Sequence, residues 1–459
     1  MQRSLAAGLH RGAYYTLQAL RGRPVARYMR QLQQWERLSR NELERITQTL
    51  LRDTLRYASE TVPFYRSGKW SEAIGRSDPR DIASWPVLER QLLREHVTDL
   101  RSSRKPIGSF YRRSSASTGT PVRVAWNPHG AAIGWANEHQ AMLWHGVPPG
   151  VDTLLFWGYG NQALNWVRNY RVFRTTQLTP ELLEEATRYS LRTRPVLCVG
   201  LPSAIAEWAR YVRANHPDLR IHVPFMKLGG EQIYPFQREE LEQYFGSRVV
   251  ETYGCTEMGP IGAECTAGAM HILSTHVHIE IFRDGVPVAP GEFGDIVATS
   301  LSNRAMPLVR CKIGDSGRIS PEPCSCGLPY PVLEDLVGRV NDMLLAADGS
   351  RVHGSTLGAG LRTVLASVPL GAIRQVLFQQ IDQQHWRVLV ESDIGFADET
   401  STKLVELVRS TCGNSCQVEV ERVNLVPREA SGKFRYYRPA GPQRSAPPTR
   451  GEMPLAEPA

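Results

Sequence analysis

The hydrophobic pattern alternates between two periods in the middle of the chain. Short apolar runs typical of buried strands, such as DTLLFWG and PVLCVGLP, are separated by longer segments whose apolar residues recur at helical spacing. TPELLEEATRYSLRT and SAIAEWARYVRAN are two of these helical segments. Between residues 151 and 235 this order indicates βαβ units and a mainly parallel sheet.

The pattern changes twice towards the C-terminus. Residues 270–319 read as alternating strands and turns, which indicates a β-rich subdomain over residues 262–336. After the segment GRVNDMLL, strand-like runs surround the helical segment ETSTKLVELVRSTC, which indicates a small α+β domain. The fold class is therefore α/β, with a large N-terminal domain and a small C-terminal one. The expected divisions are a basic helical extension (1–37), the large domain (38–341), the small domain (342–439) and a Pro-rich, disordered tail (440–459).

One helix start carries a specific signal. Ser39 stands three residues before Glu42, at the beginning of a helical pattern that runs to Glu60. This spacing is that of a capping box, in which each side chain binds the other residue's backbone N–H.

Composition limits the class of protein. With 42% apolar and 22% charged residues the chain is an ordinary folded one, and no run approaches the ~18 apolar residues of a membrane span. The eight cysteines form no disulfide scaffold, which indicates a reducing, cytoplasmic compartment. We expect no nucleic-acid partner, and either a monomer or a homodimer.

The net charge of +8 is concentrated at the N-terminus, where six arginines precede the first acidic residue, Glu36. A transit peptide, a helix lying on the body and a helix touching a membrane surface all have this composition. We favour a helical extension, with peripheral membrane contact as the alternative. The six arginines are Arg3, Arg11, Arg21, Arg23, Arg27 and Arg30.

The stretch RSSASTGTP (113–121) is rich in hydroxyl groups. Taken alone it is typical of a Ser/Thr connection, and it lacks the pattern of a Walker phosphate loop. A second stretch, ETYGCTEMGP (251–260), follows the strand-like SRVV. Here Tyr253 offers a flat face for a nucleobase and Glu257 a carboxylate for Mg²⁺ beside phosphates. Alone, this stretch would read as a turn with one charged residue.

Four further blocks accompany this stretch. KLGGEQI precedes it, and RCKIGDSGRIS, GRVNDM and EASGKFRYY follow it in that order. The ordered set resembles the adenylate-forming superfamily of acyl-CoA ligases, luciferases and peptide-synthetase adenylation domains. Within that superfamily the chain is most similar to the phenylacetate–CoA ligase branch, including relatives linked to capsular polysaccharide synthesis. The resemblance covers residues 38–439.

The resemblance implies roles for particular residues. Glu257, Thr256 and Lys433 would be catalytic, with Lys433 bridging the attacking carboxylate and the α-phosphate. Asp342 would be the hinge about which a mobile small domain swings, and Tyr159 would begin the acid pocket. The implied nucleotide-binding residues are Ser114, Ser115, Ser117, Thr118, Gly119, Thr120, Gly229, Gly230, Glu231, Tyr253, Gly254, Asp315 and Arg339.

The chain departs from the family pattern in the hydroxyl-rich loop. Ala116 and Thr120 stand where relatives often carry glycine and lysine, which leaves the loop to hold ATP through hydroxyls and backbone amides. Cys311 and Ile313 replace the aromatic residue and threonine that usually precede the Gly-Asp pair. The acid and lysine positions are intact, which argues against an inactive relative.

Four residues form a candidate metal site: Cys265, His271, and Cys324 with Cys326 in a C-x-C segment. Three thiolates and an imidazole suit a closed tetrahedral Zn²⁺ site of structural type. Members of the resembled branch have such a site at these positions. The alternative is a set of separate buried cysteines.

The expected activity is ATP- and Mg²⁺-dependent conversion of a carboxylic acid to an acyl-adenylate, followed by acyl transfer to coenzyme A. One alternative passes the acyl group to an amine or hydroxyl acceptor in surface-polysaccharide or secondary-metabolite synthesis. A second is a non-catalytic nucleotide-binding scaffold, which would not need Lys433.

Overall fold

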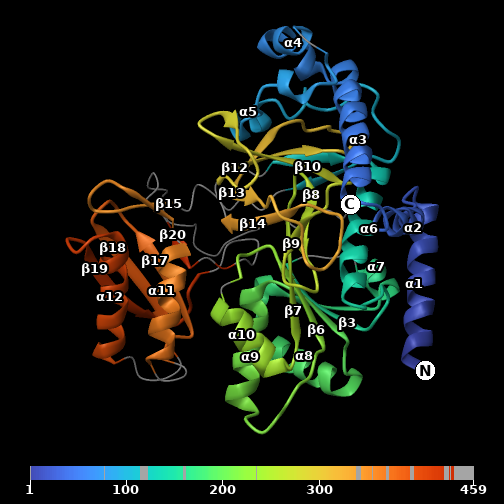
Figure 1. Cartoon of the computed structure of the whole chain (residues 1–459). Coiled ribbons are helices and arrows are strands. Elements are labelled where there is room, and N and C mark those ends of the chain that lie inside the picture. The colour runs from blue at the N-terminus through green and yellow to red at the C-terminus, as the bar shows by residue number, and fades with distance from the viewer. Residues whose placement is uncertain are drawn as a thin grey trace, which may run out of the picture. The chain divides into compact units, whose positions relative to one another are not determined.

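The chain divides into two compact units. The first comprises Met1–Asn341 with Pro427–Arg435, and the second comprises Asp342–Val426 with Tyr436–Ala459 (Figure 1). The computed structural model describes residues 2–76, 78–113, 122–158, 162–233, 235–337, 343–353, 355–368, 372–392, 397–427, 434 and 436–438.

Most of the strands of the first unit belong to one sheet. Among the described residues its order is β11-β10-β12-β13-β14-β9-β8-β7-β6-β5-β3-β4. The neighbours from β4 to β7 are parallel, and those from β7 onwards are antiparallel. The strands are β3 (Thr153–Trp157), β4 (Tyr170–Arg174), β5 (Leu197–Gly200), β6 (Phe225–Gly229), β7 (Arg248–Cys255), β8 (Gly259–Glu264), β9 (Met270–Ile272), β10 (Val277–Arg283), β11 (Val286–Pro287), β12 (Gly294–Ser300), β13 (Cys311–Ile319) and β14 (Val332–Val337).

Helices cover both faces of the parallel half. Successive residues of β7 show the two faces, because Val249 packs in the core under α8, α9 and α10, whereas Val250 packs with Met142 of α6. Parallel neighbours need crossover connections, and α7, α8, α9 and α10 lie in these connections, whereas α6 precedes β3. The helices are α6 (Pro128–Trp144), α7 (Gln162–Val167), α8 (Pro180–Thr193), α9 (Pro202–Asn215) and α10 (Pro235–Phe245).

The N-terminal segment forms two helices, α1 (Gln2–Leu20) and α2 (Val25–Trp35), with Pro24 directly before the second. Val25, Met29 and Leu32 of α2 pack against two alanines of α6. No helix in the described part of the chain is long and apolar enough to cross a membrane.

The next helix, α3 (Arg40–Thr61), begins at the expected capping box. The Ser39 hydroxyl accepts from the Glu42 N–H, and the Ser39 N–H donates to the Glu42 carboxylate over 2.8 Å. The expected helix start is therefore confirmed. Short elements follow: α4 (Gly68–Gly75), α5 (Arg90–Glu95), and the hairpin of β1 (Phe110–Arg113) and β2 (Arg123–Trp126).

The second unit is a small α+β body. Its sheet has the order β19-β18-β17-β20, with a separate hairpin β15-β16. The elements are β15 (Met343–Leu345), β16 (Arg351–His353), α11 (Ser355–Ala366), β17 (Gln375–Gln380), β18 (His385–Glu391), α12 (Asp398–Cys412), β19 (Gln417–Val423) and β20 (Tyr437–Arg438). The α/β class, with parallel strands, a β-rich portion and a small C-terminal α+β body, is confirmed.

Candidate active site

Tyr253 and Asp315 come together although 62 residues separate them. Tyr253 lies on β7, Asp315 lies on β13, and the Tyr253 hydroxyl donates to a carboxylate oxygen of Asp315 over 2.7 Å. Three strands stand between β7 and β13 in the sheet order. The antiparallel half of the sheet therefore curls until its strands face one another, and this curl brings the two blocks together.

Glu257 lies in the turn between β7 and β8, and its side chain is only 7% exposed. The Arg90 guanidinium donates to its carboxylate over 3.4 Å and to the carbonyl of Ile313 over 3.1 Å. Arg90 therefore connects the block that carries Glu257 with the block that carries Asp315. The backbone of Thr256 is held too, because the Trp126 indole N–H donates to its carbonyl over 3.3 Å.

Arg90 is a residue that sequence reasoning missed. Leu88 forms a parallel bridge with Cys311: its N–H donates to the Arg310 carbonyl, and its own carbonyl accepts from Lys312. This bridge places the start of α5 beside β13. The ion pair joins residues 167 positions apart, and nothing in the local pattern around Arg90 indicates such a contact.

The glycine segment follows β6. Gly229 is the last residue of that strand and pairs with Thr252 on β7, and Gly230 has φ of +81°, a conformation that favours glycine. Gly254 needs the same residue type for another reason. A Cβ at this position would lie 2.5 Å from the Gly259 carbonyl oxygen of the adjoining strand.

The Glu231 carboxylate joins three parts of the first unit. It accepts from the N–H and from the hydroxyl of Ser203, both over 3.1 Å, in the first turn of α9. It also accepts from the N–H of Phe434 over 2.6 Å. Phe434 directly follows Lys433 in the sequence. A carboxylate at a helix start is favourable because it satisfies free N–H groups there.

Two cysteines near these residues are packing groups. Burial, and secondarily the charge of Glu257, raises the pKa of the Cys255 thiol well above its ordinary value. Burial also raises the pKa of Cys311, which is 1% exposed. Both side chains are therefore neutral thiols at neutral pH, and neither has the thiolate character of a nucleophile.

The other sequence-predicted site residues lie outside the described residues. They are the loop residues Ser114, Ser115, Ser117, Thr118, Gly119 and Thr120, together with Tyr159, Arg339, Asp342 and Lys433.

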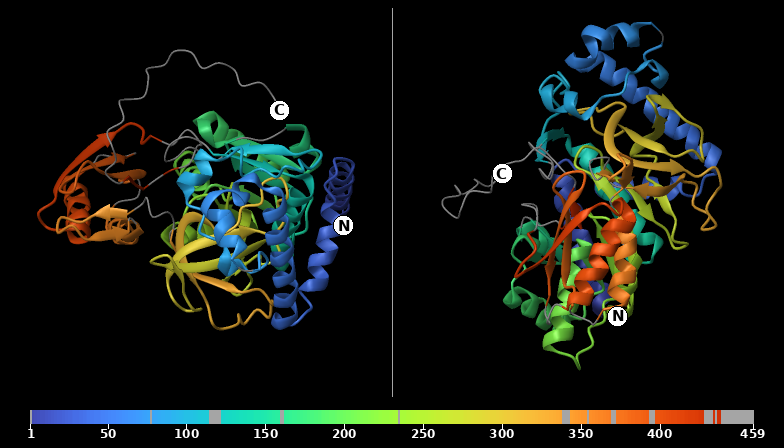
Figure 2. Two further views of the ribbon diagram at one scale, coloured as in Figure 1. Left: turned by 90° about the horizontal axis from the view of Figure 1, so that it is seen from above. Right: turned by 90° about the vertical axis from the view of Figure 1, so that its left-hand side faces the viewer.

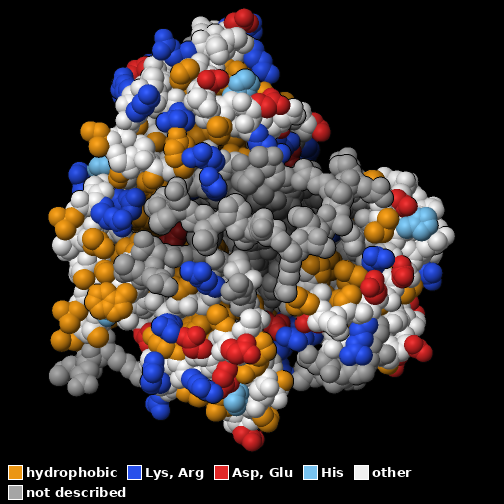
Figure 3. Space-filling model, turned by 180° about the vertical axis from the view of Figure 1, so that it is seen from behind, with side chains coloured by type: hydrophobic (Ala, Val, Ile, Leu, Met, Phe, Trp, Pro, Cys, Tyr) orange, Lys and Arg blue, Asp and Glu red, His pale blue; other side chains and the backbone are white. Residues whose placement is uncertain are grey.

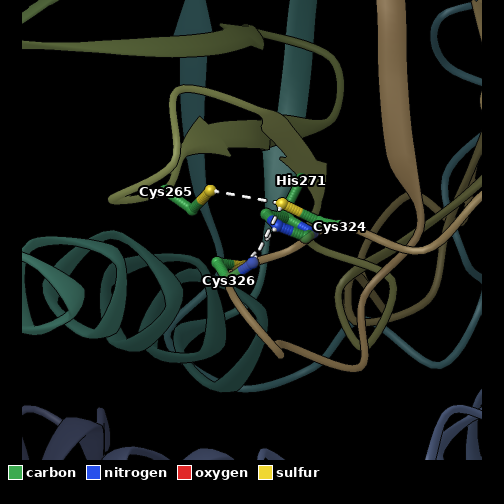
Figure 4. Close-up of side chains that lie close together, drawn as sticks. All are labelled: Cys265, His271, Cys324 and Cys326. Atoms are coloured by element: carbon green, nitrogen blue, oxygen red, sulfur yellow. Dashed lines mark hydrogen bonds between the residues drawn. The ribbon is translucent and has the colours of Figure 1, made fainter.

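The four candidate metal ligands gather in one place (Figure 4). Cys265 follows β8, His271 lies on β9, and Cys324 and Cys326 lie in the loop between β13 and β14. Their potential ligand atoms all lie within 4.8 Å of one another. The Sγ atoms of Cys265 and Cys324 are 3.8 Å apart, and His271 Nε2 is 3.1 Å from Sγ of Cys326.

This geometry fits a tetrahedral metal. Bonds of 2.3 Å to two thiolates place the sulfur atoms about 3.8 Å apart at the tetrahedral angle. His271 Nδ1 lies 2.9 Å from the carbonyl oxygen of Tyr330, so that Nδ1 carries the proton and Nε2 is free to ligate. The donor set is thus complete, with no position left for a substrate.

Glu36, which directly follows α2, links this cluster to α6. Its carboxylate accepts from Gln140, from the Trp144 indole and from the Tyr330 hydroxyl. Burial raises the pKa of Glu36, while these three hydrogen bonds act in the opposite direction. Since the Tyr330 carbonyl accepts from the histidine, the N-terminal helices and the cluster are linked through one side chain.

Comparison with known proteins first identifies the class of fold. The structure of 2-hydroxyisobutyryl-CoA ligase in the postadenylation state with R3-HIB-AMP matches with a TM-score of 0.70 at 20% identity. The match covers 88% of this chain and 90% of that chain. The fold is therefore that of the adenylate-forming ligases.

Sequence relatives narrow this class. The phenylacetate-coenzyme A ligase of Escherichia coli strain K12 is 27% identical over 335 residues, which cover 68% of this chain and 74% of the relative. The protein CapK of Staphylococcus aureus is 24% identical over 291 residues, 63% of this chain and 62% of the relative. Residues 344–438 match the family model described as the CapK C-terminal domain. The resemblance to the phenylacetate–CoA ligase branch and to CapK is thereby confirmed.

Proposed function

We propose that this protein is an ATP-dependent ligase that converts a carboxylic acid to an acyl-adenylate and then passes the acyl group to coenzyme A. The observation that carries the proposal is the contact between Tyr253 and Asp315 in this fold, with the Glu257–Arg90 pair beside it. Similarity to phenylacetate-coenzyme A ligases supports both half-reactions. Carboxylate-dependent exchange of pyrophosphate into ATP tests it.

The described residues suit the parts of a nucleotide. The ring of Tyr253 offers a stacking face for adenine, and Gly229 and Gly230 let the backbone approach it closely. The Asp315 carboxylate can accept from both ribose hydroxyls, because it has two acceptor oxygens. Thr256 and Glu257 would face the phosphates, where Glu257 would hold Mg²⁺; this ion, when bound, offsets phosphate charge.

The first half-reaction joins a substrate carboxylate oxygen to the α-phosphorus and breaks the bond to pyrophosphate. In our proposal Lys433 stabilises charge that develops at this step, and the loop from Ser114 to Thr120 holds the β- and γ-phosphates. Arg339 contacts the nucleotide, Asp342 acts as the hinge, and Tyr159 faces the acid. A thiol then attacks the acyl carbon and releases AMP.

The second step has two candidate acyl acceptors, coenzyme A and an amine or hydroxyl group. The similarity to CapK, and a C-terminal segment that matches its family model, favour an amine or hydroxyl acceptor as the second candidate. If coenzyme A is the acceptor, a thioester forms when coenzyme A is added; if the acceptor is an amine or hydroxyl, no thioester forms. A nucleotide-binding scaffold would show neither product.

We also propose a structural Zn²⁺ held by Cys265, His271, Cys324 and Cys326. The ligand-atom distances and the Tyr330 carbonyl behind His271 support it. A metal there would join β8 and β9 to the loop before β14. All eight cysteines are free thiols, which supports the cytoplasmic location that we propose.

Arg90→Gln should weaken the use of ATP. The substitution leaves the Glu257 carboxylate, which is 7% exposed, without its cation and frees the Ile313 carbonyl. We expect kcat/KM for MgATP to fall about tenfold or more, with a much smaller change in KM for the acid. Arg90→Lys should recover part of the loss, because it restores the charge but not the planar fork.

The matched control is Arg94→Gln, which removes an exposed arginine from the same short helix. It should behave as the unaltered protein does. Equal kinetics for Arg90→Gln and Arg94→Gln would contradict the role that we give to Arg90.

A further inference from the structure

The hairpin of β1 and β2 places two arginines side by side. Arg113 on β1 lies directly opposite Arg123 on β2, and both side chains are exposed. Like charges at directly opposite positions of two antiparallel strands repel each other and destabilise the pair. An anion bound between the two guanidinium groups would offset this repulsion.

A tyrosine holds a third cation beside this pair. The guanidinium carbon of Arg123 lies 4.5 Å from the centre of the Tyr111 ring, and that of Arg101 lies 5.3 Å from it. Tyr111 is 44% exposed and, being two residues from Arg113, lies on the same side of the hairpin. Contact with an aromatic ring orders a guanidinium group before a ligand binds, which lowers the entropy cost of binding. We call Arg101, Tyr111, Arg113 and Arg123 the arginine face.

The arginine face has no acidic partner within the described part of the chain. No ion pair there joins any of its three arginines to a carboxylate. Residues 101–126 contain six basic residues and no acidic one. In Figure 2 the described residues of this segment are drawn in light blue to turquoise, and Figure 3 shows Lys and Arg side chains standing out on the upper left part of the surface. A basic surface of this kind attracts phosphate-bearing ligands.

The other side of the hairpin faces the nucleotide residues. There the Trp126 indole N–H donates to the Thr256 carbonyl over 3.3 Å, and the guanidinium carbon of Arg112 lies 4.6 Å from the centre of the Trp126 ring. Because neighbouring residues of a strand point to opposite faces, Arg113 points away from this contact. The arginine face is therefore turned away from the block around Thr256, beside which the ATP phosphates lie in our proposal.

Two co-substrates of the proposed reaction carry phosphates, ATP and coenzyme A. In coenzyme A the phosphates stand at the end remote from the thiol, so that the thiol can reach the acyl carbon while the phosphates lie outside the reacting centre. Its 3′-phosphate is a phosphomonoester, whose terminal oxygens can accept from several guanidinium groups at once. A surface with three arginines that is turned away from the ATP residues suits this group.

We propose that the arginine face binds the 3′-phosphate of coenzyme A, with Arg101, Arg113 and Arg123 as donors and Tyr111 as the residue that positions two of them. This inference rests on the proposed function and states where its second co-substrate is recognised.

Calorimetric titration of the full chain with coenzyme A and with 3′-dephospho-coenzyme A tests this inference. The unaltered protein should bind coenzyme A about tenfold or more tightly, because the dephospho compound lacks the group that accepts the charged hydrogen bonds. Arg101→Gln with Arg123→Gln should weaken the binding of coenzyme A by about the same factor and leave the Kd of the dephospho compound nearly unchanged. Thermal unfolding of this variant should match that of the unaltered protein, since neither arginine has an ion pair with a described residue.

The matched control is Arg171→Gln with Arg192→Gln. These two exposed arginines also lie over one tyrosine, with guanidinium carbons 5.9 Å and 5.7 Å from the centre of the Tyr189 ring, but Arg171 pairs with Glu185. The control removes the same charge from another part of the first unit. It should bind both compounds as the unaltered protein does.

Pyrophosphate exchange separates this inference from the proposed function, because the exchange does not need coenzyme A. The exchange should be unchanged in Arg101→Gln with Arg123→Gln. Equal affinity of the unaltered protein for the two compounds would overturn the inference, as would an undiminished preference for coenzyme A in this variant. Loss of exchange together with that undiminished preference would assign the arginine face to ATP instead. Absence of exchange in the unaltered protein would contradict the proposed function and leave the titration result standing.

Discussion

Lys433→Ala is expected to lower the rate of carboxylate-dependent ATP–pyrophosphate exchange by about 100- to 1000-fold, because in our proposal it removes the cation that stabilises charge developing at the α-phosphate. The lysine would act when the carboxylate attacks and pyrophosphate leaves. It would have no such task when a thiol attacks the acyl carbon. Synthetic acyl-adenylate supplied with coenzyme A should therefore still yield thioester at close to the unaltered rate.

Lys403→Ala is the matched control for this experiment. Lys403 lies on α12, where it donates to the Ser367 carbonyl and pairs with Glu399. Lys403→Ala therefore removes one positive charge, as Lys433→Ala does, but at a residue that we do not assign to the nucleotide site. Exchange by Lys403→Ala should be unchanged. Full exchange activity in Lys433→Ala would remove the catalytic role of Lys433 and favour the scaffold alternative.

The second large effect concerns the cysteine cluster. We expect the unaltered protein to bind one equivalent of zinc at the proposed site, and Cys324→Ser with Cys326→Ser to abolish this binding and lower the melting temperature by roughly 5–10 °C. Two of the four ligands are lost, and those left, Cys265 and His271, are fully buried. Metal analysis of the purified protein, followed by thermal unfolding, measures both effects.

Ser325→Ala provides the comparison, because it alters the exposed residue between the two cysteines and leaves every donor in place. Its zinc content should match that of the unaltered protein. An unaltered protein without zinc, or a double variant that retains it, would contradict the proposed site.

Much of the fold follows from local patterns. The alternation of apolar runs with helical segments predicts the strands β3 and β5 and the helices α8 and α9, and the Ser39–Glu42 pair predicts the start of α3. These features depend on residues a few positions apart. The sequence therefore carries them without reference to the rest of the chain.

Contacts of the site are harder to predict, because they depend on the curl of the sheet. The strand-like SRVV before this stretch predicts that Tyr253 and Glu257 lie at a strand end and turn, as the structure shows. The hydrogen bond from Tyr253 to Asp315 exists only because β13 folds back towards β7. Arg90 was missed for the same reason, since its partner Glu257 is 167 residues away.

The exposed leucines of α1, Leu5, Leu9 and Leu20, show a different limit. An N-terminal helix is predictable from the sequence, but apolar residues occur on both of its sides, for example Tyr14 on one and Leu9 on the other. Only packing against the neighbouring helices decides which side stays in contact with water. The exposed leucines could therefore not be identified before the structure was known.

The central claim is that this protein activates a carboxylic acid through an acyl-adenylate. ATP–pyrophosphate exchange across a panel of carboxylic acids that begins with phenylacetate, with and without coenzyme A, tests it most directly. The account predicts exchange that depends on one class of acid, and AMP with a thioester once coenzyme A is added. Pyrophosphate exchange with none of the acids, by a folded protein that binds MgATP, would contradict it.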